Sequence, residues 1–337
     1  MITAAATAQS PRTPGPGSRE ADSFSRRQIA AAEPRIRLLV RETLLEVSDA
    51  LSQRVGGKVF LKLENLQHTG SFKVRGASNK ILSLGSDLKT TVVAASSDNH
   101  GAAVAYVLRE LGGKGLIFVP TGASPAKVEN IRHFGAEVAF FGDDSIETET
   151  HARAWAATHG WAFVSPYNDS AVVAGQGTLG MEIARQAAQI DNVFVAVGGG
   201  GLIGGIALYL KSVNPGIRVI GCSPAASNVM ARSVRAGRIV EMPSEPTLSD
   251  GTAGGVEDNS MTLALCRDLV DHWIDVSEAE IVEAMRLFID AHHMLLEGAA
   301  GVAIAGALKA DKTWTAGRSV IVICGANISR DTLKSVL

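Results

Sequence analysis

Four consecutive glycines are the strongest chemical signal in the sequence. They follow the apolar run 193–197, which is typical of a buried strand, and precede a helical pattern over 202–213. Because glycine has no Cβ, the backbone N–H groups can converge on an anion, and the start of the helix adds its dipole. We therefore predict a phosphate site here. A plain tight turn is the alternative, although four glycines are entropically costly for a turn. The four residues are Gly198, Gly199, Gly200 and Gly201.

The glycines do not match the two common nucleotide motifs well. Residues 199–204 satisfy the G-x-G-x-x-G spacing of dinucleotide-binding proteins, but no acidic residue ends the next strand, 218–222. No Lys-Ser or Lys-Thr pair follows the glycines, as the P-loop requires. NAD is thus a weaker alternative for the bound phosphate compound.

Lys73 lies between a turn and a helical pattern, within Thr-Gly-Ser-Phe-Lys-Val-Arg-Gly-Ala (69–77). The dipole at a helix start lowers the pKa of an amine, which is what a Schiff-base lysine needs. A solvated surface lysine is the more common outcome, so this segment alone does not decide between the two.

Two other segments could bind a ligand. Ser-Ser-Asp-Asn-His-Gly (96–101) joins a buried strand to a helix, where hydroxyls, an amide and free N–H groups could hold a carboxylate. Ordinary helix capping explains Ser and Asp equally well. Cys324 ends the last apolar run, 320–324, and open α/β sheets bind ligands at the carboxyl ends of their strands. A small buried residue is the alternative for Cys324.

These segments lie in a regular alternation of strand and helix patterns. Apolar runs at 59–63, 92–95, 116–119, 138–141, 162–164, 193–197, 219–222 and 320–324 alternate with helical patterns. Such an order favours parallel sheets covered by helices on both faces. Since 337 residues exceed one typical domain, we expect two α/β domains. The long segment 241–257 has no periodicity, and such loops are usually functional.

Composition limits the classes of partner. The net charge is −2, which gives no electrostatic case for nucleic acid or an anionic membrane. The uncharged run 193–210 is interrupted by glycines, so we expect no membrane span, and no apolar signal segment opens the chain. Three cysteines do not form a disulfide framework. We expect a disordered tail over 1–28 and a cytoplasmic protein.

Taken together and in this order, the motifs resemble those of the fold type II pyridoxal-phosphate enzymes, and most closely the threonine/serine dehydratases and serine racemases. The lysine motif matches from Lys62 through 77, and the tetraglycine loop and 247–254 also match. The resemblance implies an α/β fold, similar to tryptophan synthase β, with two open, twisted, mostly parallel sheets flanked by helices. It implies a large cofactor-binding domain (29–91 and 167–337), a small mobile domain (92–166) and a homodimer.

The resemblance also implies the roles of individual residues. Lys73 would form the Schiff base with pyridoxal 5'-phosphate and move the Cα proton, and Ser97 would be a second catalytic residue. The cofactor would contact Phe72, Asn99, Cys324 and the four glycines. The amino-acid substrate would contact Ser96, Ser97, Asp98, Asn99, His100, Gly101, Asp250 and Gly251.

The implied activity is a dehydratase or ammonia-lyase. It would convert a small β-hydroxy amino acid, such as threonine or serine, to a 2-oxo acid and ammonia through an aminoacrylate. A neutral thiol at Cys324 would not stabilise a protonated pyridinium, which favours elimination over a full carbanion. A racemase on the same fold is the main alternative, with Ser97 as the opposite-face acid/base. An NAD-dependent oxidoreductase and a non-catalytic amino-acid-binding protein are further alternatives.

The sequence departs from the family pattern at several positions. Asp98 replaces a usual glycine, and a carboxylate beside the substrate carboxylate is unfavourable unless it points away or pairs with a cation. Ser223 and Val229 replace metal ligands of some relatives, so we expect no divalent metal there. Glu297 begins Glu-Gly-Ala-Ala-Gly in place of Glu-Pro-Ser-Gly. The missing metal ligand leaves room for a catabolic branch, such as the dehydratases of hydroxyectoine use.

Overall fold

The computed structural model describes residues 24–85, 90–243 and 245–337. The expected tail ran to residue 28, but the first helix, α1 (Arg26–Ile36), begins earlier and Phe24 is already buried. The backbone N–H of Ser25 donates to the Gln28 side chain at 2.7 Å, which stabilises this helix start. The tail prediction is therefore wrong for residues 24–28, and its remainder, 1–23, lies outside the described residues.

The larger sheet has six strands in the order β1-β2-β10-β7-β8-β9. Every neighbouring pair is parallel except β1 and β2, which are antiparallel. The strands are β1 (Leu45–Val47), β2 (Lys58–Leu63), β7 (Asn192–Ala196), β8 (Arg218–Pro224), β9 (His272–Val276) and β10 (Arg318–Ile323).

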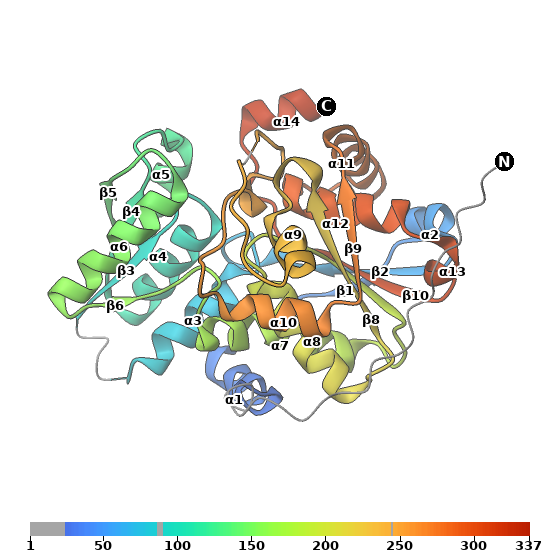
Figure 1. Ribbon diagram of the computed structural model, residues 1–337, viewed down its shortest axis with the longest axis horizontal. Coiled ribbons are helices and arrows are strands. Elements are labelled where there is room, and N and C mark those ends of the chain that lie inside the picture. The colour runs from blue at the N-terminus through green and yellow to red at the C-terminus, as the bar shows by residue number, and fades with distance from the viewer. Residues whose placement is uncertain (1–23, 86–89, 244) are drawn as a thin grey trace.

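The smaller sheet has four parallel strands in the order β5-β4-β3-β6. Its strands are β3 (Thr91–Ala95), β4 (Lys114–Val119), β5 (Glu137–Phe140) and β6 (Ala162–Phe163). It stands apart from the larger sheet, on the left in Figure 1. Together the two sheets confirm the predicted fold class.

Helices cover both sheets. Those that follow or flank the larger sheet are α2 (Asp49–Val55), α7 (Ser170–Gln186), α8 (Gly201–Val213), α9 (Val229–Ala236), α10 (Met261–Leu269), α11 (Glu278–His292), α12 (Gly298–Lys309), α13 (Lys312–Thr315) and α14 (Arg330–Val336). Those nearer the smaller sheet are α3 (Lys73–Ser83), α4 (Asn99–Leu111), α5 (Pro125–His133) and α6 (Ser145–His159). None of the helices in the described part of the chain is long and apolar enough to cross a membrane.

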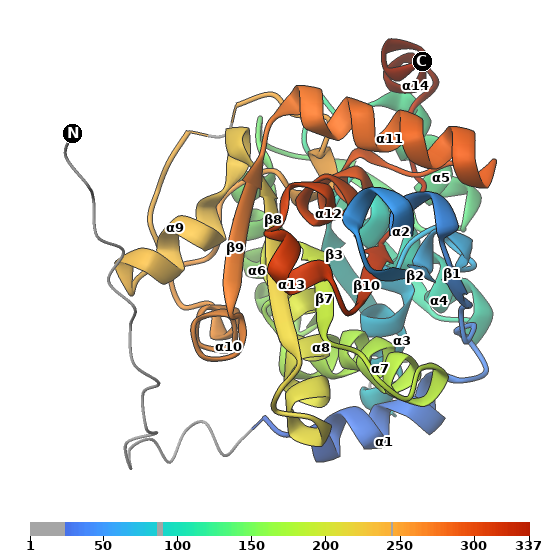
Figure 2. The same cartoon turned by 90° about the vertical axis from the view of Figure 1, so that its right-hand side faces the viewer.

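Helix α12 is the central helix of the larger part. It packs against β7, β8, β9 and β10, while α7 and α8 lie on the opposite face of the sheet (Figure 1, Figure 2). Residues from Gly298 to Ala307 are all buried, so the helix is surrounded by protein and has no polar stripe. A helix without an amphipathic period gives no 3.6-residue signal, which is why the sequence did not predict it. Edge strands β1 and β9 were missed because they are half-buried or exposed.

Helix α3 joins the two parts. Its residues Val74, Ala77 and Ile81 are buried in the same apolar cluster as the smaller sheet, yet α3 also packs against α7 of the larger part. Full burial of a Val or Ile side chain contributes about 1.5–3 kcal/mol. The division at residue 91 therefore cuts through a shared core, and the mobility of 92–166 stays a prediction.

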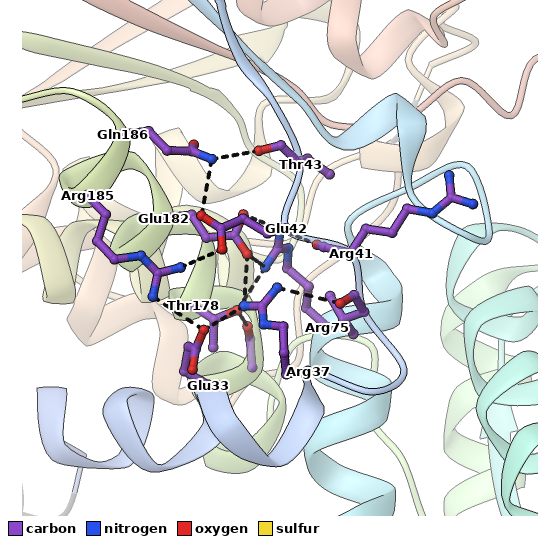
Figure 3. A network of polar contacts seen from close by, with 12 residues as sticks. Glu33, Arg37, Arg41, Glu42, Thr43, Arg75, Thr178, Glu182, Arg185 and Gln186 are labelled. Carbon is purple, nitrogen blue, oxygen red and sulfur yellow. Dashed lines mark hydrogen bonds and ion pairs between the residues drawn. The ribbon is translucent and has the colours of Figure 1, made fainter.

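A fully buried ion network lies under the start of α3. Arg75 donates to Glu64 through Nε (2.7 Å) and Nη2 (2.8 Å), and to Glu182 through Nη1 and Nη2 at 2.8 Å each. Thr178 accepts a further bond from Nη1 at 3.1 Å. Figure 3 shows Arg75, Glu182 and Thr178 turned toward one another. Lys62 on β2 also donates to Glu182, at 2.6 Å. The network therefore links β2, α3 and α7.

We expect Glu182→Gln to lower the free energy of unfolding by about 3 kcal/mol, because it leaves Arg75 and Lys62 buried with less compensating charge. Urea unfolding followed by circular dichroism measures the change. Asp268→Asn is the control, since the Arg267–Asp268 pair is half-exposed and its loss should cost less than about 1 kcal/mol.

The effect should depend on pH in a defined direction. Burial alone would raise the pKa of Glu182, but Arg75 and Lys62 lower it to about 2, from an ordinary 4.5. The ionised carboxylate thus stabilises the fold above pH 4.5, and this contribution is lost as the pH falls toward 2. The stability difference between wild type and Glu182→Gln should shrink over that interval. A constant difference would show that the charge of Glu182 is not its source.

Candidate active site

Two loops position the start of α3 at the carboxyl edge of the larger sheet. Phe72 N–H donates to the carbonyl of Cys324 at 3.0 Å, and Ser71 forms a bridge with Gly325, just beyond β10. The first residue of α3, Lys73, is thereby placed beside the end of β10. This is where ligands bind in open α/β sheets.

The partly buried Lys73 amine lines both cavities of the site. Its Nζ donates to the carbonyl of Pro166 at 3.0 Å and lies 5.3 Å from the centre of the Phe72 ring. Burial lowers the pKa of Lys73 to about 8, although Glu149 and Glu297 act in the opposite direction. A larger fraction of the amine is therefore neutral, and nucleophilic, than at an ordinary lysine.

The tetraglycine loop lines a cavity together with Phe72, Lys73 and Cys324. Gly200 has φ +82°, a left-handed conformation that favours glycine, and α8 begins at the next residue. A Cβ on Gly199 would lie 2.4 Å from the Tyr167 ring, so no larger side chain fits there. Backbone without side chains at the start of a helix is the donor set that a phosphate needs.

The opposite end of this cavity holds a thiol and a carboxyl group. Cys324 is buried, and burial followed by the nearby Glu297 raises the pKa of its thiol well above the ordinary value, so the thiol is neutral. Its Sγ lies 3.8 Å from Glu297 Oε1. Burial raises the pKa of Glu297 to about 8, while hydrogen bonds donated by Asn99 and Asn327 favour its charged form.

Hydrogen bonds with Glu297 and Asn327 hold the side chain of Asn99, at the start of α4. Its Nδ2 donates to both Glu297 oxygens, at 3.1 and 2.9 Å, and its Oδ1 accepts from Asn327 Nδ2 at 2.6 Å. The amide is thereby held in the lining of the cavity that Lys73 also lines. The sequence singled out Glu297 only as a departure from the family motif, and its partnership with Asn99 was not predicted.

The loop 96–101 lines a second, larger cavity that meets the first at Lys73. Its lining includes Ser96, Ser97, Asp98, Asn99, His100, Asp250 and Gly251, all from the predicted substrate set. Gly101 does not line it; a Cβ there would lie 2.3 Å from the carbonyl of Ser96. His100 is neutral, because burial lowers its pKa to about 3, and its Nε2 bonds to the carbonyl of Val164 at 2.9 Å.

The unexpected carboxylate of Asp98 has an internal partner. Lys127 on α5 lies 2.8 Å from Asp98 Oδ2 and 2.7 Å from Asp250 Oδ2. Burial alone would lower the pKa of Lys127, but these two carboxylates raise it above its ordinary value. A cation thus reduces the expected conflict with a substrate carboxylate. It was not predicted, because Lys127 is 29 residues away from Asp98 in the chain.

A second charged group on the cavity wall was also missed. Arg153 lies 3.1 Å from Glu149 and 2.8 Å from Glu257. The spacing of Glu149 and Arg153 on α6 is the ordinary i,i+4 spacing of a solvated helix pair, so it did not single them out.

Ser223 and Val229 occupy the two positions at which some relatives have metal ligands. Ser223 lies one residue before the end of β8, with its hydroxyl 3.5 Å from the carbonyl of Val197, and Val229 is buried at the start of α9. Within residues 24–85, 90–243 and 245–337, no three His, Cys, Asp or Glu side chains are grouped so that they could hold a metal ion.

The fold and the two adjoining cavities define a cofactor-dependent enzyme of the α/β class. The family model for pyridoxal-phosphate dependent enzymes matches residues 36–325, and the chain belongs to this family. It is a pyridoxal-phosphate-dependent lyase of the threonine/serine dehydratase group. Its cofactor is pyridoxal 5'-phosphate rather than a nicotinamide dinucleotide.

Named relatives cover nearly the whole chain. The catabolic L-threonine dehydratase of Escherichia coli (strain K12) is 38% identical over 91% of this chain and 94% of its own length. The L-threonine ammonia-lyase of Geobacter sulfurreducens is 37% identical over 92% of this chain and 77% of its own length. Maize serine racemase has a similar structure, with a TM-score of 0.87, 32% identity and coverage of 93% of this chain and 96% of that chain.

We expect Lys73→Ala to remove the visible absorbance of the bound cofactor and all turnover, because no other amine occupies that position. In wild type, borohydride should bleach the absorbance and label the peptide that contains Lys73, as mass spectrometry would record. Lys80→Ala on the same helix is the control, since Lys80 pairs with Asp169 at 2.6 Å and does not line the cavity. A label elsewhere would contradict the assignment of Lys73.

The same amine should also give reconstitution a distinctive pH dependence. With a pKa of about 8, about a tenth of Lys73 is neutral at pH 7, against fewer than about one in a thousand for an ordinary lysine. The rate of cofactor uptake by the cofactor-free protein should therefore rise with pH and level off above about pH 8.

Proposed function

We propose that the protein converts a small β-hydroxy amino acid, with threonine and serine as the first candidates, to a 2-oxo acid and ammonia. The observation that carries the proposal is the neutral Cys324 thiol in the cavity that Lys73 enters. A neutral group beside a pyridine nitrogen does not stabilise a protonated ring, unlike an aspartate. A long-lived carbanion is then unfavourable. Elimination, in which the β-hydroxyl leaves as the Cα proton is removed, is favoured instead.

The residues of the site would have separate roles in binding the cofactor, binding the substrate and moving the proton. Pyridoxal phosphate, when bound, withdraws electrons from the α-carbon of the amino acid. The four glycines would hold its phosphate, with Phe72 against the ring and Asn99 at the ring hydroxyl. Lys73, with a pKa of about 8, can accept the Cα proton near neutral pH. Backbone and hydroxyl groups of the 96–101 loop would bind the substrate carboxylate, with Gly251 at the facing wall.

A racemase is the second candidate, because Ser97 and Lys73 line the same cavity. Racemisation needs a second proton donor on the face of the α-carbon opposite Lys73. The Ser97 hydroxyl would be that donor. The relatives named as threonine dehydratase and ammonia-lyase favour elimination.

We expect equal amounts of ammonia and 2-oxo acid from L-threonine or L-serine, and no turnover by Lys73→Ala. The assay couples 2-oxo acid to a dehydrogenase, with ammonia measured separately, for both configurations of each substrate. Chiral chromatography follows the remaining amino acid. Accumulation of the opposite enantiomer without 2-oxo acid would overturn the dehydratase proposal in favour of the racemase.

We further propose a cytoplasmic homodimer whose small domain, 92–166, closes over the substrate. All three cysteines are buried and free, which suits a reducing compartment.

The proposed dimer surface consists of large, exposed apolar side chains on neighbouring segments. Hydrogen bonds join these segments: Arg41 donates to the carbonyl of Leu66, Leu63 N–H to the carbonyl of Leu44, and Asn65 to the carbonyl of Leu295. These side chains are Leu38 (97% exposed), Leu44 (55%), Leu66 (39%) and Leu295 (48%).

We expect wild type to elute as a dimer and Leu38→Glu to shift it toward monomer, because a charge at a buried interface is unfavourable. Light scattering coupled to size exclusion measures the mass. Leu337→Glu is the control, since Leu337 is also exposed (68%) but follows α14 and belongs to none of these segments. A monomeric wild type would contradict the proposal.

A further inference from the structure

Carboxyl side chains outnumber cationic side chains in the lining of the substrate cavity. Apart from Lys73, two triads line it: Asp98–Lys127–Asp250 and Glu149–Arg153–Glu257. In each triad two carboxylates contact one cation. When all three groups are ionised, each triad therefore has a net charge of −1. A ligand that brings its own cation would balance this excess, whereas a second carboxylate would add to it.

The approach to the cavity is also acidic. A surface groove shares Ser145, Ile146 and 253–257 with the cavity, and the loop between α9 and α10 forms part of its wall (Figure 1). Among the described residues that line it there is no Lys or Arg. Its carboxylates beyond Glu257 are Asp143, Asp144, Glu241, Glu245, Asp250 and Asp258. Such a groove concentrates cations and repels anions.

Glu149 is the carboxyl group best placed to meet a substrate cation. It lines the cavity, its side chain is 15% exposed, and in its ionised form it raises the pKa of the Lys73 amine. Burial raises the pKa of Glu149 to about 8, with the neighbouring Glu257 as the next cause. A cation bound there would restore the ionised form and release a proton.

We infer that the site prefers β-hydroxy amino acids whose side chain ends in an ammonium group, with Glu149 as the residue that contacts that group. This inference rests on the proposed function and names its substrate class. Without substrate, Lys127 holds Asp98 and Asp250 close together, and Arg153 does the same for Glu149 and Glu257. The ammonium group of the substrate would supply the further positive charge.

Substrate competition tests the preference. The holoenzyme is assayed for ammonia and 2-oxo acid with β-hydroxy-α,ω-diamino acids of four, five and six carbons, with threonine, and with 3-hydroxyaspartate. We expect kcat/KM for at least one diamino acid to exceed that for threonine by about 10-fold or more, and 3-hydroxyaspartate to be the poorest. Added salt should reduce the preference, because the groove charges are exposed. Threonine equal to or better than every diamino acid would overturn the inference.

A variant pair assigns the preference to Glu149. In Glu149→Gln the kcat/KM ratio of diamino acid to threonine should fall about 10-fold, mainly through a higher KM for the diamino acid. Glu147→Gln is the matched control on the same helix, since Glu147 accepts from Asp143 N–H and does not line the cavity. An unchanged ratio in Glu149→Gln would overturn the role of Glu149.

A measurement on wild type alone covers the case in which the variant does not fold. Ornithine and lysine lack a β-hydroxyl, so they should inhibit without elimination, and each should inhibit at least about 10-fold more strongly than norvaline or norleucine. Equal inhibition would overturn the inference. If a cofactor-loaded enzyme released no 2-oxo acid from any substrate, the proposed function would fail, whereas turnover of threonine without a diamino preference would overturn the inference alone.

Discussion

The clamp of two carboxylates on Arg75 is the constraint on which the site depends. Arg75 is fully buried and two residues after Lys73, so any shift of its guanidinium would move the reactive amine. Glu64 holds it from the end of β2 and Glu182 from α7. A buried ion pair is often no more stabilising than apolar packing, but it accepts few geometries. The main effect of this ion pair is to fix the position of the start of α3 between the two sheets.

The cofactor cavity is shaped by close backbone approaches. Gly199 faces the Tyr167 ring, and Gly325 lies where a Cβ would be 2.5 Å from Glu297 Oε2. Tyr167 in turn accepts a hydrogen bond from Glu257 N–H at 2.9 Å. A tightly packed phosphate loop is thereby connected to the loop that lines the substrate cavity. Glycine is therefore required at both 199 and 325, where a Cβ would collide with the Tyr167 ring or the Glu297 carboxyl group.

Much of this arrangement could be predicted from local sequence. Lys73, the tetraglycine loop and the 96–101 loop each carry a signal in adjacent residues, and parallel strands bring their ends to one edge. Helix α12 gave no signal because it is apolar all round, and the half-buried edge strand β9 gave only a weak one. Lys127 and Glu149 were missed for a different reason. Their spacing is ordinary, and their role comes only from partners far away in the chain.

Asp98 illustrates why a charge has to be considered with its partners. From the sequence it is a lone carboxylate beside a carboxylate-binding loop, which argues against an ordinary amino-acid substrate. In the folded chain Lys127 neutralises it and in doing so reaches across to Asp250, so the charge left over belongs to the triad. The cavity can therefore bind the α-carboxylate at the start of α4 and still be negative at its far wall. The departure at Asp98 is thus accommodated by Lys127 and Asp250, and the groups around Lys73 remain in place.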